Sequence, residues 1–487
     1  MSTHTAYGDS RPSFLSFWLR VREFAVPPSM IETATARREA GDWAGACAAA
    51  RVDADLDLRS VARTHGRELA TRIRGDLRHL APDLLRWHLP RIAPHGLLRP
   101  GLTIPLARYV AESGRAGPVH LVARTPPAWA DGGQRISLAL WDAASRDTAA
   151  RGHPHPRPSR RFRLDLHRHL WDARRADELR IRSGADRSPA AGPDVPGPVP
   201  GPVPGPASGP ASVPASVPAS VPEAYRCAVG QWAAEAGRLL RAEGRSDGPV
   251  AVRLGPRRPL ILDVTGDGGV DAPGWRIVSA SPGVGGSALP VLPDAATWVL
   301  PDLELLRAGA IEVDRLHPLI ASALVPDHVP SGPSTQWEDQ VAGPRFVECR
   351  GSRHRIGLVD GVLTALDHDP DEIRREELLV ALSGTPLPCL QAIDEAHRRP
   401  DCLVGVRERL HHGDIAGALA VVEGLLGPDA MLRAGALRDA LEAAAERRIA
   451  YGLFRAGLAD PAPHRPRPAP ARPRDHRSHP RHARTAR

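Results

Sequence analysis

The sequence contains no lysine and no asparagine, so all 64 of its basic residues are arginine. The missing lysine excludes a nucleotide-binding loop of the G-x-x-x-x-G-K-[ST] type, a protein kinase and a Schiff-base enzyme, because each requires that amine. The missing asparagine excludes a Cys-His-Asn protease triad. Both absences are typical of a GC-rich genome, so the abundance of arginine says little about nucleic-acid binding.

Cysteines are few, and long apolar runs are missing. No two of the five cysteines have C-x-x-C spacing, which argues against a disulfide framework or a zinc knuckle and fits a reducing compartment. No run of about 18 apolar residues occurs, so the sequence predicts neither export nor a membrane span. We therefore expect a cytoplasmic protein without a cofactor. The cysteines are Cys47, Cys227, Cys349, Cys389 and Cys402.

Positive charge is concentrated at one end of the chain. Residues 461–487 are rich in proline and hold eight arginines and one aspartate, or +7 of the formal net charge of +8. Such a segment cannot bury apolar surface, and the sequence predicts a disordered basic tail. Weak, sequence-independent contact of this tail with nucleic-acid phosphates is therefore one alternative function.

Proline and glycine also divide the chain. Residues 188–222 contain 12 prolines and 5 glycines, a composition that favours an extended polyproline spacer. The sequence thus predicts an N-terminal domain over 1–187, this linker, and a C-terminal domain over 223–460 that ends in a helical bundle. The expected fold class is α+β, with two mixed domains that each combine helices and a small antiparallel sheet.

Local patterns support that class. Ser29 and Glu32 stand in capping-box relation at the start of a predicted helix. Alternating apolar and polar residues predict strands over 118–124, 135–141 and 160–167. Three strand-like segments separated by short turns over 346–368 predict an antiparallel meander.

A Gly-Asp step with small residues after it occurs twice, in "EAGDWAGACAAA" and "HHGDIAGALAVV". In each case the glycine, Gly41 or Gly413, should end one helix, and the aspartate, Asp42 or Asp414, should cap the next. Each segment resembles a single tetratricopeptide-type hairpin, which implies two isolated helical hairpins, since repeat arrays need about three consecutive units. The segments "DWAGACAAARVDADLDLR" and "ALDHDPDEIRREELL" are similar to a family of actinobacterial proteins. That resemblance implies a shared fold and no activity.

Apolar side chains are concentrated near the N-terminus. "FLSFWLRVREFAV" holds three of the six phenylalanines and one tryptophan. Core packing is the favoured interpretation, and a docking segment for a partner groove or a membrane-surface helix are the alternatives. The candidate interaction residues are Phe14, Phe17, Trp18 and Trp43.

The segment "LILDVTGDGGVD" allows three interpretations. Asp263, Asp267 and Asp271 match positions one, five and nine of a calcium loop, but Gly274 stands where the bidentate carboxylate belongs. The same letters resemble the first motif of Rossmann-type methyltransferases, with Thr265 in place of the first glycine. A plain turn between two strands is the favoured interpretation.

Two further motifs carry weaker signals. His167 and His169 would share one face if their segment were a strand, a geometry that can bind zinc. The letters Asp394 to His397 resemble the DEAH box of helicases, but that box works with a lysine-containing loop that this chain lacks. We interpret the box as a solvated helix face and the histidines as surface or partly buried side chains.

No serine, histidine and acid arrangement with a recognised spacing occurs. The sequence therefore favours a non-enzymatic protein-interaction or regulatory adaptor with an unidentified protein partner. An enzyme of unrecognised type stays open, because an active site can assemble from residues that form no linear motif.

Overall fold

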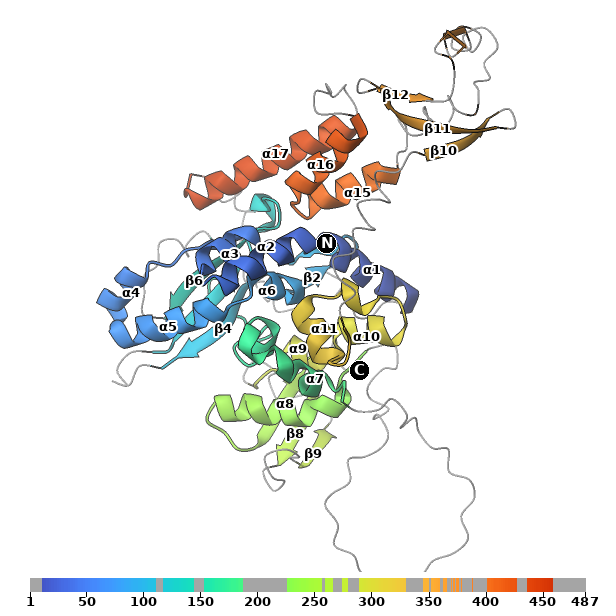
Figure 1. The fold of residues 1–487 in the computed structure, drawn as a ribbon. Helices are drawn as coiled ribbons and strands as arrows, with labels where there is room; N and C mark the ends of the chain where they lie inside the picture. The colour runs from blue at the N-terminus through green and yellow to red at the C-terminus, as the bar shows by residue number, and fades with distance from the viewer. Residues whose placement is uncertain are drawn as a thin grey trace, which may run out of the picture.

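The computed structural model describes residues 11–110, 117–143, 153–186, 226–255, 259–265, 274–278, 289–329, 345–349, 352–359, 362–365, 401–426 and 436–458, with a few single positions between 369 and 388. Helices and small sheets alternate along these residues (Figure 1). The α+β class predicted from the sequence is confirmed.

Helices begin the chain and lie on a four-stranded sheet. Pro82 occupies the first turn of its helix, where a missing N–H costs nothing. The helices are α1 (Arg11–Phe24), α2 (Pro28–Glu39), α3 (Trp43–Ala49), α4 (Leu58–His65), α5 (Arg67–His79) and α6 (Pro82–His88). The sheet has the order β1-β6-β5-β4, formed by β1 (Val52–Ala54), β4 (Thr103–Tyr109), β5 (Val119–Arg124) and β6 (Ile136–Asp142).

This first sheet matches the prediction only in part. The two strands that the sequence predicts, β5 and β6, pair antiparallel, and the unpredicted β4 pairs antiparallel with β5. The unpredicted β1 pairs with β6 in parallel, with Val52 opposite Ile136. The sheet is therefore mixed. A three-residue strand at the sheet edge has no side-chain alternation long enough to reveal its direction in the sequence.

A second group of elements continues after the sheet and after residue 226. It contains a β2–β3 ladder (Arg91–Ile92 and Leu97–Leu98) and the 3₁₀ helices η2 (Ala128–Ala130), η3 (Arg168–Leu170), η4 (Ala173–Glu178) and η5 (Val313–Arg315). The α-helices are α7 (Leu179–Ser183), α9 (Asp294–Thr297), α10 (Pro301–Arg307) and α11 (Pro318–Leu324).

One large core joins residues from both sides of the predicted linker. Arg22 donates two hydrogen bonds to the Asp302 carboxylate, at 2.8 and 2.7 Å, and both side chains are buried. The ring of His317 lies 3.0 Å from a carboxylate oxygen of Asp83. The predicted division into two domains is therefore not confirmed. We call the described residues of 11–186 and 300–325, which share this core, the body.

Two smaller cores accompany the body. Helix α8 (Val229–Ala242) packs on an antiparallel sheet of β7 (Gly248–Val252), β8 (Leu260–Thr265) and β9 (Gly274–Val278), around Trp232. Helices α15 (Asp401–His411), α16 (Ile415–Leu426) and α17 (Ala436–Arg455) form their own cluster around Val406, Leu410 and Ala418. We call residues 401–426 and 436–458 the C-terminal module. Figure 1 shows it lying against the body near α2 and α3.

The predicted meander is confirmed. Strands β10 (Arg345–Cys349), β11 (Ser352–Val359) and β12 (Val362–Ala365) pair antiparallel in sequence order. After the meander, the Asp369 carboxylate accepts a hydrogen bond from the Asp371 backbone N–H at 3.1 Å.

Two local predictions are wrong. Helix α2 begins at Pro28 without a side-chain cap, so Ser29 lies inside the first turn and forms no capping box. Proline fixes the first helical φ and starts the helix earlier than the serine would. The segment 160–167 forms no strand, because the Leu166 and His167 N–H groups bond to carbonyls three residues back and leave no row of donors for a sheet.

Several predicted features lie outside the described residues. These are the linker, the basic tail, the DEAH-like letters and the two aspartates Asp267 and Asp271. Among the described helices, none is both long enough and apolar enough to cross a bilayer.

Candidate functional site at the contact between two helical hairpins

The two Gly-Asp segments form the hairpins that the sequence predicts. Hairpin one is α2–α3 and hairpin two is α15–α16. Gly41 and Gly413 both have positive φ, 78° and 80°, where glycine carries no steric cost. Asp42 then accepts a hydrogen bond from the Gly45 N–H at 2.8 Å, and Asp414 accepts one from Gly417 at 3.2 Å.

Hairpin two rests on the residue that follows hairpin one. Arg51, directly after α3, donates hydrogen bonds to the His412 carbonyl at 2.8 Å and to the Asp414 carboxylate at 3.1 Å. Arg51 has φ of 59°, a conformation uncommon for a side chain that is not glycine. Arg51 thus keeps an unfavourable backbone conformation in which its guanidinium reaches the turn of hairpin two.

A fully buried arginine ties the same turn to the body. Arg86 is 0% exposed and donates to the carbonyls of Ala25, Gln134 and His412, at 2.9, 2.5 and 3.3 Å. Burial and neighbouring guanidiniums lower the pKa of Arg86. Among the described residues this guanidinium donates to backbone carbonyls and to no carboxylate, and Asp131 favours its charge only from a distance.

Helix α17 makes further polar contacts with the body. The Tyr451 hydroxyl donates to Asp53 at 2.5 Å, and the Arg455 guanidinium pairs with Asp55 through both of its terminal nitrogens. Asp53 also accepts from Arg135 at 3.0 Å. Burial raises the pKa of the Asp53 carboxyl, but the bonds from Arg135 and Tyr451 outweigh that effect and lower it overall.

Glycines let the two surfaces approach closely. A Cβ at Gly132 would lie 2.0 Å from Cβ of Tyr451, and one at Gly413 would lie 2.0 Å from the Gly133 carbonyl oxygen. Apolar contact across the same surface includes the Trp129 and Phe454 rings, whose centroids are 5.4 Å apart. The contact between body and module is therefore close and mainly polar.

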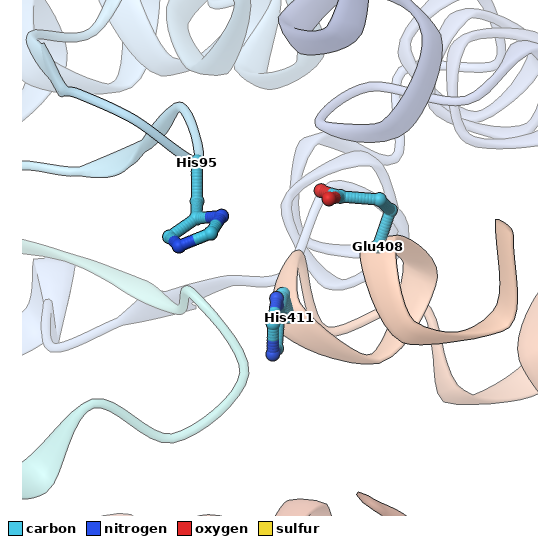
Figure 2. Close-up of side chains that lie close together, drawn as sticks. All are labelled: His95, Glu408 and His411. Carbon is cyan, nitrogen blue, oxygen red and sulfur yellow. The ribbon is translucent and has the colours of Figure 1, made fainter. Parts of the chain in front are cut away.

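Beside this contact, three side chains could together hold a metal ion (Figure 2). His95 lies on the turn between β2 and β3, while Glu408 and His411 lie one turn apart on α15. One ligand atom from each lies within 4.8 Å of the others, and no second such group of three occurs among the described residues. Burial lowers the pKa of the His411 ring, and the charge of Glu408 opposes that shift.

The sequence-predicted histidines lie elsewhere, around a cavity of about 70 Å³. His167 and His169 line it with His88, and the rings of His167 and His169 are 5.7 Å apart. Burial lowers the pKa of His88 to about 4. Burial also opposes ionisation of Glu235, but bonds from His167 and Arg182 lower its pKa to about 2.

At about 70 Å³ this cavity is far smaller than the roughly 300–1,000 Å³ of typical ligand pockets. Arg182 already pairs with Glu235 at 2.5 Å. We therefore interpret these histidines as part of a buried structural network.

The other predicted site residues have structural partners. Phe14, Phe17 and Trp18 are buried in the body's core, and Trp43 packs against it, which favours the core-packing interpretation. Asp263 pairs with Arg276 across β8 and β9 at 2.9 Å, as a strand residue would.

Sequence reasoning missed His95, Glu408 and His411 as a group. The Glu-x-x-His spacing on a helix was the available signal, but the third ligand comes from a distant turn that no spacing connects to it. Comparisons with protein-family models, curated proteins and solved structures found no match for this chain. Function is therefore inferred from the geometry of the described residues.

Proposed function

We propose that the protein is a non-enzymatic regulatory adaptor whose C-terminal module docks reversibly on the body and contacts a protein partner when released. The observation that carries this proposal is the contrast between the module's own apolar core and its polar attachment. Val406, Leu410 and Ala418 pack within the module, while Arg51 and Arg455 hold it to the body. Polar contacts between units of one chain are typical of interfaces that open.

The module also carries apolar side chains that the body leaves uncovered. Ile449 and Leu453 stand one turn apart on α17 and are 64% and 44% exposed. Neighbours at this spacing lie on one face of a helix. Exposed apolar side chains grouped in this way favour contact with another protein.

A single methyl group tests the reversible docking. Gly132→Ala would place a Cβ 2.0 Å from Cβ of Tyr451 and 3.0 Å from the Arg447 carbonyl oxygen. Gly132 does not have positive φ, so the substitution strains only the contact with the module. Gly117→Ala is the matched control, since its Cβ would meet nothing within 4 Å.

In small-angle X-ray scattering of the full chain, Gly132→Ala should increase the radius of gyration and Gly117→Ala should not. As baits in a native lysate, Gly132→Ala should recover more of a specific partner than wild type, and Ile449→Gln with Leu453→Gln should remove that gain. The adaptor proposal fails if the scattering of Gly132→Ala matches wild type, or if release changes no partner's recovery.

A further inference from the structure

The three side chains in Figure 2 come from two parts of the molecule, the body and the C-terminal module, which contact each other. His95 belongs to the body, and Glu408 and His411 belong to the module. Gly96, the next residue after His95, permits this approach, because a Cβ there would lie 2.4 Å from a methyl carbon of Val21. The position of His95 is thus set by close packing of its turn against α1.

Glu408 has only distant partners for a largely buried carboxylate. Its side chain is 12% exposed, and its Oε2 atom is buried without a hydrogen bond among the described residues. The nearest ring nitrogen, Nε2 of His412, is 4.0 Å from that oxygen, too far for a hydrogen bond. Arg20 is 3.8 Å from the other oxygen, and its own side chain is 45% exposed. A carboxylate removed from water without hydrogen bonds is unfavourable unless a cation neutralises it.

The donor set selects the kind of cation. Two imidazoles and one carboxylate suit zinc and its first-row neighbours, whereas magnesium and calcium prefer oxygen ligands alone. We propose that His95, Glu408 and His411 bind one divalent transition metal ion of the zinc type, with a fourth position open to water. The exposed His95 and His411 side chains leave that side of the site accessible.

Binding requires a small closure of the site. Bonds of about 2.0–2.2 Å in tetrahedral geometry place ligand atoms about 3.4 Å apart. The ligand atoms here lie within 4.8 Å of one another, so the side chains must draw together by roughly 1 Å. Since His95 and His411 are exposed, rotation about their side-chain bonds can supply this movement.

Such an ion would join the body to the module. If the module docks reversibly, as proposed above, the ion stabilises the docked arrangement, because it binds the closed form more tightly than the open one. This regulatory consequence rests on the proposed function. Metal binding itself requires only the geometry of the three side chains.

Hairpin one supplies an internal control. Aligned on their Gly-Asp steps, Glu408 and His411 correspond to Ala36 and Glu39. The same fold of hairpin therefore exists without these ligands. Glu408→Ala introduces the residue that hairpin one already carries at that position, so it should leave the hairpin intact.

Titration of the tag-free full chain with Co²⁺ tests the site, read by the visible absorption of the bound ion and by competition with Zn²⁺. The number of bound ions should be one higher in wild type than in a variant combining His95→Ala, Glu408→Ala and His411→Ala.

Each single substitution should lower the affinity for that extra ion. The loss should exceed the roughly 10- to 100-fold that is typical when a group that only orients a ligand is removed. The combined variant keeps the four histidines of the tail, so it provides the background. His155→Ala, an exposed histidine of the body, should bind as wild type does.

Arg20→Gln should bind the ion more tightly than wild type, because it removes the cation nearest to Glu408. Equal Co²⁺ binding by wild type and the combined variant would overturn the proposal. So would single substitutions that leave the affinity unchanged.

The two proposals can fail separately. If wild type binds the ion but Gly132→Ala stays compact, the metal site stands and the releasable module is rejected. If Gly132→Ala releases the module but wild type binds no extra ion, the adaptor stands and the metal site is rejected.

Discussion

Hairpin one and hairpin two share a local structure and differ in their surroundings. In both, an arginine five residues before the capping aspartate contacts its carboxylate, Arg37 at 3.4 Å and Arg409 at 3.0 Å. In both, a Cβ on the third residue after the aspartate would collide with that carboxylate, at 2.1 Å for Gly45 and 2.2 Å for Gly417. The recurrence of the two segments therefore reflects one way to build a tight turn.

The surroundings give the two capping aspartates different roles. The Asp42 side chain is 43% exposed and serves its own hairpin. The Asp414 side chain is 10% exposed and also binds Arg51 of the body. The two segments share a motif that backbone geometry requires. Only hairpin two also uses that motif to contact another part of the molecule.

The largest expected effect comes from the arginine that holds hairpin two to the body. Arg86→Met keeps the aliphatic stem but leaves the buried carbonyls of Ala25 and Gln134 without this donor, while the His412 carbonyl keeps its bond from Arg51. At roughly 1–3 kcal/mol for each unsatisfied group, the free energy of unfolding should fall by about 2–6 kcal/mol. Urea denaturation measures this, with the exposed Arg67→Met as control. A loss no larger than the control's would contradict the role of Arg86.

Acid should weaken the body that carries hairpin one. His88 has a folded pKa of about 4, and burial holds the pKa of His169 well below its ordinary value. Below pH 6.5 these rings bind protons in the unfolded chain but not in the folded one. The free energy of unfolding therefore falls as the pH drops toward 4. Each ring contributes about 1.4 kcal/mol per pH unit within that window.

Urea denaturation of the full chain between pH 7 and pH 4.5 should show this slope. His88→Gln keeps a donor for the Leu84 and Leu170 carbonyls. It should reduce the slope of stability against pH by the part that one histidine ring contributes. An unchanged slope in that variant would show that His88 does not cause the acid sensitivity.

Matched substitutions at the two caps sharpen the comparison directly. Asp42→Ala should cost about 1 kcal/mol, the usual value of a lost helix cap. Asp414→Ala should cost about 2–3 kcal/mol, because the cap and the partly buried bond to Arg51 are lost together. Thermal unfolding of both variants measures the difference. Equal losses would mean that the contact with Arg51 adds nothing.

The smallest effect is expected at the end of α17. Arg455 and Asp55 are one-third or less exposed, at 33% and 30%, and their pairing should contribute no more than about 1 kcal/mol. Arg438→Ala on the same helix removes an exposed pair with Glu442 that does not reach the body. Arg455→Ala should lower the melting temperature more than Arg438→Ala does. Indistinguishable values would remove this pair from the docking contact.

Sequence reasoning succeeded where the signal is local. Gly41, Asp42, Gly413 and Asp414 predicted both hairpins, since backbone conformation and capping depend on neighbouring residues. Alternation likewise predicted β5 and β6, and the short turns over 346–368 predicted the antiparallel meander.

The long-range contacts could not be predicted. Arg22 and Asp302 are 280 positions apart, and nothing in either neighbourhood marks them as partners. The same is true of His95 with Glu408 and His411. Even within one segment, local bonding overrode an apparent alternation, as residues 160–167 show.

Native-state hydrogen exchange is the most direct test of the claim that the module docks reversibly. Amides of a unit that opens alone exchange at a lower free energy than those that need global unfolding. Core amides of α15, α16 and α17 should exchange together at one lower free energy, while those of α2 and α3 should exchange with the body at the global value. If the amides of both hairpins share the global value, the module is a fixed part of the body and does not dock reversibly.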